Sequence, residues 1–233
     1  MDISKVPTYK VLNEGEVRLT SMMGDDLDVV NAARVSFSSH QTEIDDRAIG
    51  LINFLMKNKH ATPFEHVVFN FYVKCPIFVA REWFRHRWSS FNEMSMRYHV
   101  PEKIDYYIPS SEDLRKQVGK PGSYSFEKIN DMSIHLKTVS LMEQVYALSN
   151  NVYRDLLQMG VAKEIARSVL PVGQYTEFVW TVNLRSLINF LSLRNDEHAQ
   201  KEIRDYAKVI ELMFEETLPV IYKSFVDNGR QAI

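Results

Sequence analysis

The stretch 67–76 of this chain reads Val67-Val68-Phe69-Asn70-Phe71-Tyr72-Val73-Lys74-Cys75-Pro76. Positions 67, 69, 71 and 73 are all apolar, whereas the positions between them mix apolar and polar side chains. Because successive side chains of a strand point to opposite faces, this alternation predicts a strand with one fully apolar face and one mixed face. Such a strand belongs in a sheet that is covered by helices.

Regular elements are predicted on both sides of this strand. A strand is expected over residues 16–22, and apolar residues at helical spacing predict helices over 26–35 and 48–56. Pro76 suits the first turn of a helix, and the spacing that follows predicts that this helix continues to Trp88. The central strand is therefore expected to lead directly into a helix.

The C-terminal half is predicted to be mainly helical, with one further strand. Residues 101–124 are rich in proline and glycine, so we expect a long connection there and leave open whether it closes as a lid. A long amphipathic helix with an apolar packing face follows, and Gly160 should stop it. The other expected elements are a helix over 161–170, a strand over 177–183, a helix capped by Asn183, and a helix over 196–217 that Pro219 ends.

Composition places the chain among ordinary folded domains. It has 233 residues, of which 45% are hydrophobic, so a substantial core and a single domain spanning residues 1–233 are expected. The 28 basic and 30 acidic residues give a net charge of -2, so nothing global indicates a nucleic-acid or membrane partner. The single cysteine, Cys75, excludes an internal disulfide and a cysteine metal cluster.

Targeting signals and metal-binding patterns are also absent from the sequence. Residues 1–5 lack a basic region followed by an apolar run, and no window is apolar enough to cross a bilayer. Together with the lone cysteine, this predicts a cytoplasmic protein. The seven histidines have no paired helical spacing and no cysteine partners, so no metal site is expected.

The most unusual segment is residues 85–98, which read Arg85-His86-Arg87-Trp88-Ser89-Ser90-Phe91-Asn92-Glu93-Met94-Ser95-Met96-Arg97-Tyr98. Its arginines stand without any lysine, and a planar guanidinium can hold an oxyanion through two hydrogen bonds. From Glu93 to Val100 polar and apolar residues alternate, which predicts an extended segment with one polar face. The segment therefore predicts a site for a phosphorylated ligand. The alternative is that its arginines answer a helix dipole and its aromatic residues belong to the core.

Two common phosphate-binding devices are missing. The chain has only eight glycines and no Gly-x-Gly-x-x-Gly cluster, which argues against a Rossmann fold. A Gly-Lys-Ser/Thr phosphate loop is absent as well. The charge of a bound phosphate would have to be met by side chains, and the candidates are Arg85, His86, Arg87 and Arg185.

The motif Arg85-His86-Arg87, then seven residues, Ser95 and Arg97-Tyr98, resembles the signature of the flavin-dependent thymidylate synthases, the ThyX family. The similarity extends to residues 60–66, 76–81 and 180–187, with Arg194 and His198 beyond. It covers nearly the whole chain. The resemblance implies a mixed α/β (α+β) fold in which helices pack around a twisted β-sheet.

The same resemblance implies a reaction, the reductive methylation of dUMP to dTMP. Methylenetetrahydrofolate would donate the one-carbon unit, and FAD reduced by NADPH would supply the hydride. The family is a homotetramer whose active sites are shared between subunits. No cysteine nucleophile is expected, because the motif contains none and Cys75 lies in an apolar context. Ser95 is expected to bind substrate, because neither Met94 nor Met96 can act as its general base.

The resemblance also assigns residues to ligands. Arg194 is expected to be catalytic by stabilising the pyrimidine ring anion, although it could instead answer the dipole of its helix. The residues implied to bind dUMP are Glu82, Trp83, Phe84, Arg85, Glu93, Met94, Ser95, Met96, Arg97, Arg167 and Arg194. The residues implied to bind FAD are His60, Thr62, Arg85, His86, Arg87, Glu93, Asn183, Leu184, Arg185 and Asn189.

Two non-catalytic alternatives remain open at this point. One is a helical oligomerising protein with solvated arginines. The other is an RNA- or nucleotide-binding module, for which the net charge of -2 is unfavourable. Such a module would use Arg81, Arg85, Arg87 and Arg97 on phosphates and Trp83, Trp88, Phe91 and Tyr98 for base stacking.

Overall fold

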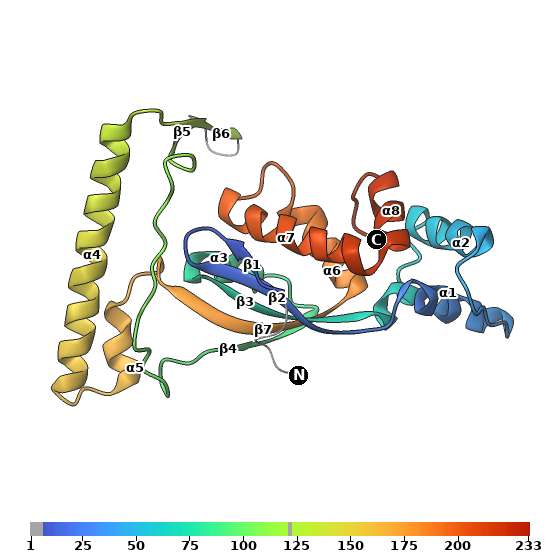
Figure 1. Cartoon of the computed structure of the whole chain (residues 1–233), viewed down its shortest axis with the longest axis horizontal. Helices are drawn as coiled ribbons and strands as arrows, with labels where there is room; N and C mark the ends of the chain where they lie inside the picture. The colour runs from blue at the N-terminus through green and yellow to red at the C-terminus, as the bar shows by residue number, and fades with distance from the viewer. Residues whose placement is uncertain (1–6, 121–122) are drawn as a thin grey trace.

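The structure, a computed structural model, describes residues 7–120 and 123–233. The prediction made for residues 1–5 and the part of the expected connection at 121–122 lie outside the described residues. Figure 1 shows a curved sheet with helices packed over one side of it and a long helix, α4, standing beside one end. The mixed α/β fold that the sequence implied is confirmed.

The sheet has five strands in the order β1-β2-β3-β7-β4. All four strand pairings are antiparallel, so the sheet is not a doubly wound Rossmann sheet, as expected from the glycine pattern. β3 lies at the centre and contains the stretch 68–76 of the strand predicted from alternation. The strand bounds are β1 Tyr9–Val11, β2 Gly15–Met23, β3 Val68–Pro76, β4 Ser89–Glu93 and β7 Tyr175–Asn183.

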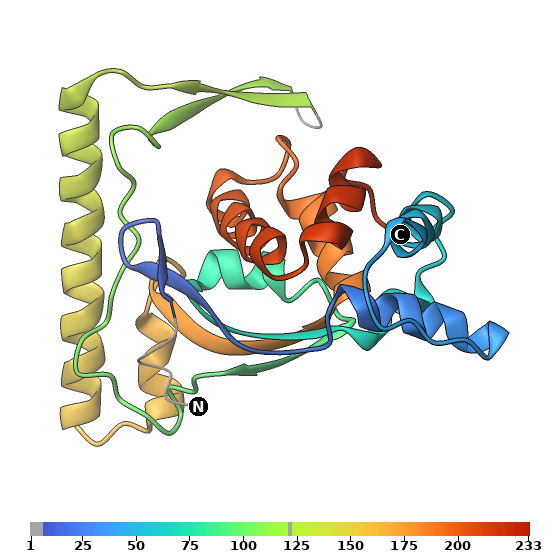
Figure 2. The same cartoon turned by 45° about the vertical axis from the view of Figure 1, so that its right-hand side comes forward.

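The helices fall into three groups around the sheet (Figures 1 and 2). The first group, over one face, comprises α3 (Ile77–Trp83), α6 (Leu184–Arg194), α7 (Lys201–Thr217) and α8 (Pro219–Asp227). At one end of the sheet lie α1 (Asp26–Arg34), η2 (Val35–Phe37), α2 (Asp46–Lys57) and η3 (Thr62–His66). Beside the other end lie α4 (Met132–Gln158), α5 (Lys163–Ala166) and η4 (Arg167–Val169).

Helix ends follow the local chemistry of the sequence. Asp25 caps α1 in a reciprocal capping box with Asp28. The Asn183 side chain accepts a hydrogen bond from the Ser186 amide and caps α6, as predicted. Gly160 follows the end of α4 with a φ of +82°, a left-handed conformation that costs glycine little.

The core is aromatic where the helices meet the sheet. Trp83 of α3 is 0% exposed. Its ring centroid lies 5.3 Å from that of Trp180, 5.0 Å from Phe190 and 5.4 Å from Phe178. Such edge-on and tilted contacts add to the free energy gained by burying the rings. This cluster joins α3, β7 and α6 into one rigid unit.

Two predictions about the segment after β3 were wrong. α3 ends at Trp83 and not at Trp88, because Ser89 already pairs with Val182 at the start of β4. The extended segment expected from Glu93 to Val100 stops at Glu93. The amides of Tyr98 and His99 both donate to the Ser95 carbonyl, which closes a turn there. Pairing with a distant strand overrides the local periodicity in the first place, and a local turn overrides it in the second.

Three further boundaries differ from the sequence prediction. The connection predicted over 101–124 contains a hairpin arm, with strands β5 (Arg115–Lys120) and β6 (Ser123–Lys128). Pro219 does not simply end a helix but begins α8, because proline is well tolerated at a first helical position. The helix expected from residue 196 begins at Lys201.

Most of the apolar face predicted for α4 is exposed within the described chain, although Leu156 packs against the small buried cluster of Met96, Tyr153 and Ala166. Leu141, Val145 and Leu148 are 49%, 57% and 65% exposed, and Tyr153 is the one buried residue of this helix in the part of the chain that the structure describes. The sequence predicts that this face packs without indicating its partner, and within the described residues most of the face remains exposed. No helix among the described residues combines the length and the apolar character needed to cross a membrane.

Replacement of Trp83 should reveal its structural role. Trp83→Ala is expected to lower the free energy of unfolding by about 3–5 kcal/mol, because it opens a cavity in the aromatic cluster. Trp88→Ala is the matched control, since that side chain is 88% exposed, and it should change stability by less than about 0.5 kcal/mol. Urea unfolding measures both values. Similar losses for the two variants would contradict the assignment of Trp83 to the core.

Candidate active site

Arg194, the last residue of α6, is held by three hydrogen bonds. Its Nε donates to His86 Nε2 at 2.9 Å, its Nη1 to a carboxylate oxygen of Glu82 at 3.0 Å, and its Nη2 to the Glu82 main-chain carbonyl at 3.1 Å. We call this arrangement the Arg194 clamp. Its members come from α6, from α3 and from the turn that follows α3. The clamp joins segments more than one hundred positions apart in the sequence.

The clamp contains one charged pair and one neutral imidazole. Burial, reinforced by the adjacent Arg194 charge, lowers the pKa of His86 from 6.5 to about 4. Burial also raises the pKa of Glu82, although the Arg194 guanidinium opposes this rise. Arginine stays protonated at any physiological pH. A neutral His86 is therefore a hydrogen-bond acceptor for a permanently charged partner.

Beside the clamp lies a cleft of about 980 Å³, which we call the arginine cleft. It runs between the start of β4, the length of α6 and the C-terminal residue of the chain. Its walls are formed by Glu65, Arg85, His86, Arg87, Trp88, Ser89, Val182, Asn183, Arg185, Ser186, Asn189, Leu193, Arg194 and Ile233.

The arginine cleft brings together most of the residues that the resemblance assigned to FAD. Arg85, His86 and Arg87 reach it from the turn after α3, and Asn183, Arg185 and Asn189 reach it from α6 and its cap. Arg85 and Arg87 are exposed, and their guanidinium groups have no hydrogen-bond or ion-pair partner among the described residues. Arg185 contacts Glu65 at 2.5 Å. Three guanidinium groups on one wall, two of them unpaired, suit a ligand with more than one phosphate.

His60, Thr62 and Leu184 are not part of the cleft walls. His60 is exposed and packs edge-on against Phe54. Thr62 is exposed at the start of η3, one turn before Glu65, which does line the cleft. The side chain of Leu184 is 0% exposed and belongs to the core. Leu184 can therefore reach a ligand in the cleft only through its main chain.

A second cleft, of about 460 Å³, lies at the opposite end of β4. We call it the Arg167 cleft. Glu93, Met94, Met96 and Arg167, all assigned to dUMP by resemblance, contribute to its walls. Arg97 is held at its rim by Glu164, 3.3 Å away. The complete lining is Ile77, Glu93, Met94, Met96, Glu164, Arg167, Ser168, Leu170, Gln174 and Thr176.

The residues assigned to dUMP are thus divided between two places. Arg85 and Arg194 line the arginine cleft, whereas Glu93 to Arg97 and Arg167 gather around the other. The strand β4, from Ser89 to Glu93, separates the two groups. Four residue steps of a strand span roughly 13 Å. The two groups of residues expected to bind dUMP therefore lie at opposite ends of β4.

Two aromatic residues in the dUMP set have other roles in this chain. Trp83 is fully buried in the aromatic cluster, so its side chain does not reach a ligand in either cleft, contrary to the contact implied by resemblance. Phe84 packs against Phe91 and Phe178, with ring centroids 4.8 Å and 5.1 Å away. Both residues position the turn that carries Arg85. They act on the site through this support.

Several site residues were missed by sequence reasoning. Glu65, Trp88, Leu193 and Ile233 line the arginine cleft. Trp88 lies within the quoted motif and Glu65 lies within the similar stretch 60–66, so both had a visible signal in the sequence. Nothing in the sequence indicates that the last residue of the chain folds back to this cleft.

The Arg167 cleft also contains two unpredicted polar residues. The Thr176 hydroxyl donates to a Glu93 carboxylate oxygen at 2.7 Å and orients it. Gln174, left unassigned in the sequence, is 5% exposed and its Nε2 donates to the Met96 sulfur at 3.2 Å. Both residues belong to the start of β7 or the turn before it. They fix one wall of the cleft.

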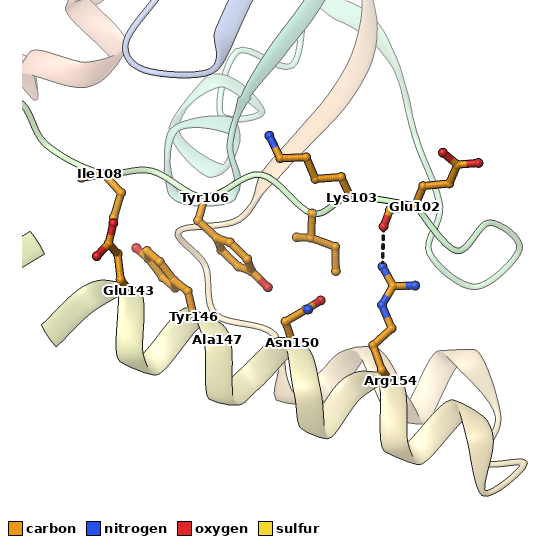
Figure 3. A pocket seen from close by; sticks show the side chains of 10 residues that line it. Glu102, Lys103, Tyr106, Ile108, Glu143, Tyr146, Ala147, Asn150 and Arg154 are labelled. Atoms are coloured by element: carbon orange, nitrogen blue, oxygen red, sulfur yellow. Dashed lines mark hydrogen bonds between the residues drawn. The ribbon is translucent and has the colours of Figure 1, made fainter. Parts of the chain in front are cut away.

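A third cleft lies away from these two sites, between α4 and residues 102–108 (Figure 3). Tyr106 and Tyr146 stack there with ring centroids 4.4 Å apart, and Arg154 donates to the main chain of the facing segment. None of the residues assigned to a ligand lines it. Its contacts anchor α4 to the connection before the hairpin arm.

Residues 7–120 and 123–233 contain neither an accessible thiol nor a cluster of metal-binding side chains. Cys75 is 0% exposed, and burial raises the pKa of its thiol well above the usual value. A thiol in that environment is a poor nucleophile. In the described part of the chain no group of three or more histidine, cysteine or acidic residues could hold a metal ion.

The chain folds as an antiparallel sheet covered by helices on one side. It has two clefts lined by arginine, and the Arg194 clamp lies beside one of them. These are the features of an α/β protein with clefts suited to phosphorylated ligands. Residues 18–220 match the family described as thymidylate synthase complementing protein. The chain is 48% identical over 218 residues to the flavin-dependent thymidylate synthase of Thermosipho africanus (strain TCF52B), covering 94% of this chain and 93% of that protein. It is 43% identical over 221 residues to the flavin-dependent thymidylate synthase of Thermus thermophilus, covering 95% of this chain and 79% of that protein.

Solved structures give the same result. The UMP/dUMP methylase PolB from Streptomyces cacaoi bound with 5-Br dUMP is 35% identical, with a TM-score of 0.87 and coverage of 97% of this chain and 100% of that chain. The same methylase bound with 5-Br UMP gives a TM-score of 0.86, with coverage of 96% and 99%. The chain belongs to the flavin-dependent thymidylate synthase family.

Stability should fall as the pH falls from 6.5 to 4, because of His86. An unfolded chain protonates its histidines near pH 6.5, whereas folded His86 stays neutral down to about 4. The unfolded state therefore binds more protons in this window, and the free energy of unfolding rises with pH across it. Urea unfolding of the wild type and of His86→Gln should show a steeper pH dependence for the wild type. Parallel curves would contradict the lowered pKa.

Proposed function

We propose that this protein methylates dUMP to dTMP, with FAD as its flavin, methylenetetrahydrofolate as one-carbon donor and NADPH as reductant. The observation that carries the proposal is the Arg194 clamp at the edge of a cleft walled by arginines. The buried thiol of Cys75 offers no sulfur nucleophile to a substrate. Methylation must then rely on stabilised negative charge in the pyrimidine ring, as the sequence suggested.

The fit of FAD to the arginine cleft is supported by size and by charge. A volume of about 980 Å³ is large for a ligand pocket. Arg85, Arg87 and Arg185 can meet the two phosphates of a dinucleotide without a glycine-rich loop. The amides of the first turn of α6, beginning at Leu184, add a favourable dipole for an anion. When bound, the flavin would supply the redox chemistry.

Arg194 is the residue we assign to catalysis. The clamp employs three of the five N–H groups of its guanidinium. The remaining N–H groups, one on each terminal nitrogen, are left to contact a ligand. A preorganised cation at the edge of the pyrimidine would stabilise the ring anion without having to reorganise during the reaction. The clamp thus provides the rigidity that this role requires.

The phosphate of dUMP is assigned to the Arg167 cleft. Arg167 lines this cleft, and Arg97 pairs with Glu164, which lines it too. Ser95 begins a turn between Met94 and Met96, both of which belong to the walls. The Met94 and Met96 side chains and Ile77 supply apolar lining next to these charges. This combination of a cationic end and an apolar wall suits a nucleoside monophosphate.

The division of the dUMP set between two clefts supports an active site shared between subunits. Arg194 lines the cleft at one end of β4 and Arg167 lines the cleft at the other end, which favours a nucleotide whose pyrimidine and phosphate are bound by different chains. A second copy can supply the missing half. The exposed apolar face of α4 offers surface for such assembly. We therefore propose a homotetramer, as the resemblance implied.

Domain organisation and location complete the proposal. The chain is proposed to act as one domain, because the aromatic cluster links the sheet to α3 and α6 and the two clefts lie at opposite ends of one strand. A cytoplasmic location is proposed from the single cysteine. The RNA-binding alternative is not favoured, because Trp83 is buried and cannot stack on a base. We propose no nucleic-acid or membrane partner.

The activity can be tested on the purified protein and on Arg194→Ala. The wild type should carry FAD that NADPH bleaches, and it should form dTMP from dUMP and methylenetetrahydrofolate. Arg194→Ala should retain the flavin but lose about 10²–10³-fold in kcat, the usual cost of removing one transition-state donor. Lys208→Ala, at an exposed position of α7, is the control for effects of mutagenesis and purification that are unrelated to the site. Purified wild-type protein that carries no flavin, or that forms no dTMP, would contradict the proposal.

Sharing of the active site can be tested by mixing two inactive variants. Arg194→Ala impairs the arginine cleft, and Arg167→Ala impairs the other cleft, so each homo-oligomer should be inactive. After co-refolding of equal amounts, about a quarter of the composite sites should contain both wild-type halves. Recovery of about that fraction of wild-type activity is expected. Absence of recovery in verified hetero-oligomers would show that each site is built within one chain.

A further inference from the structure

The contact between His86 and Arg194 constrains the proton on the imidazole. Arg194 Nε carries a hydrogen and has no lone pair to accept one, so His86 Nε2 must be the acceptor at 2.9 Å. A neutral imidazole that accepts at Nε2 carries its proton on Nδ1. The geometry therefore selects one of the two neutral tautomers.

The surroundings of His86 keep the imidazole in place and uncharged. Its ring lies edge-on to Phe190 with centroids 5.0 Å apart, and its main-chain carbonyl accepts from the Ser89 hydroxyl at 2.7 Å. The charged groups around it are Arg194 from α6, Glu82 from α3 and the neighbouring arginines 85 and 87. Burial and the charge of the Arg194 guanidinium oppose a positive charge on this imidazole.

Glu82 and His86 hold different parts of the Arg194 guanidinium. Glu82 provides the opposite charge through its carboxylate and a second anchor through its main-chain carbonyl. His86 fixes the remaining edge of the guanidinium plane, at Nε. Two contacts to one residue would allow the plane to pivot about Glu82, whereas a third contact from another residue prevents this. His86 is therefore the part of the clamp that sets the orientation.

We propose that His86 is a positioning residue for Arg194, which accepts from Nε as the Nδ1–H tautomer and directs the remaining N–H groups of the guanidinium toward the bound pyrimidine. This role rests on the function proposed above and differs from the FAD contact that resemblance assigned to His86. The Nδ1–H group is then a donor available to an acceptor atom in the arginine cleft. The tautomer and the guanidinium orientation are fixed by the same bond.

Two substitutions separate the acceptor from the rest of the side chain. The amide of glutamine reaches the position of Nε2, whereas the shorter amide of asparagine reaches only that of Nδ1. His86→Gln should therefore keep kcat within a few-fold of wild type. His86→Asn should lose about 10²-fold in kcat, since a displacement of about 1 Å in a catalytic group has that cost. The KM for dUMP and the flavin content should change little in either variant, and His40→Gln, on an exposed loop, is the control.

The tautomer can be read directly from the ¹⁵N spectrum of histidine-labelled holoenzyme at neutral pH, with His86 assigned by its loss in His86→Gln. Protonated Nδ1 and unprotonated Nε2 are expected. In Arg194→Ala the signal should move toward the Nε2–H tautomer that predominates in free histidine. A merely structural histidine would not respond to removal of Arg194 in this way.

Several outcomes would overturn the inference. Equal kcat values in His86→Gln and His86→Asn would contradict the orienting role of His86. A loss of kcat that is fully explained by a lower flavin content would contradict it too. An Nε2–H tautomer in the wild type would refute the hydrogen-bond assignment. A wild type that forms no dTMP would overturn the proposed function and with it the kinetic half of the inference. The spectrum would still decide the tautomer in that case.

Discussion

The pairing of β3 with β7 is the feature that places every part of the site. Nine residue pairs, from Val68 with Asn183 to Pro76 with Tyr175, hold these strands antiparallel, so α3 leaves one end of the pair and α6 leaves the other. Nine-residue strands span roughly 27 Å. The two helices, of 7 and 11 residues, together cover about the same length, roughly 27 Å. They run toward each other and meet at the Arg194 clamp.

The same strand pair also explains why the chain holds two clefts and not one. β4 adds to the exposed edge of β7, with its first residue, Ser89, at the arginine cleft and its last, Glu93, at the Arg167 cleft. A rigid strand keeps the two groups of arginines apart. This separation is the basis of the proposal that two copies of the chain contribute to one active site. The exposed apolar face of α4 is consistent with such an assembly, because water is a poor environment for that much apolar surface.

Much of the fold could be read from local patterns, and the failures share a cause. The alternation in β3, the Asn183 cap and the Gly160 stop depend on neighbouring residues alone, and all three were predicted correctly. The end of α3 and the extent of β4 depend on pairing with β7, almost one hundred residues later. The α4 stripe was correctly identified as apolar, but periodicity cannot tell whether the partner of such a stripe belongs to the same chain.

Residue patterns alone were enough to predict the central strand, the lack of a usable thiol, and the family through the motif at residues 85–98, and they favour arginine over a glycine-rich loop for binding phosphate. The folded chain was needed to show that Trp83 belongs to the core and that Glu82 and His86 hold Arg194. It was also needed to show that the residues expected to bind dUMP lie at opposite ends of β4. The physical reason is the sequence separation over which each effect acts. Periodicity, caps and residue chemistry act over a few positions, whereas hydrogen-bond geometry, burial and the pKa of His86 arise where distant segments meet.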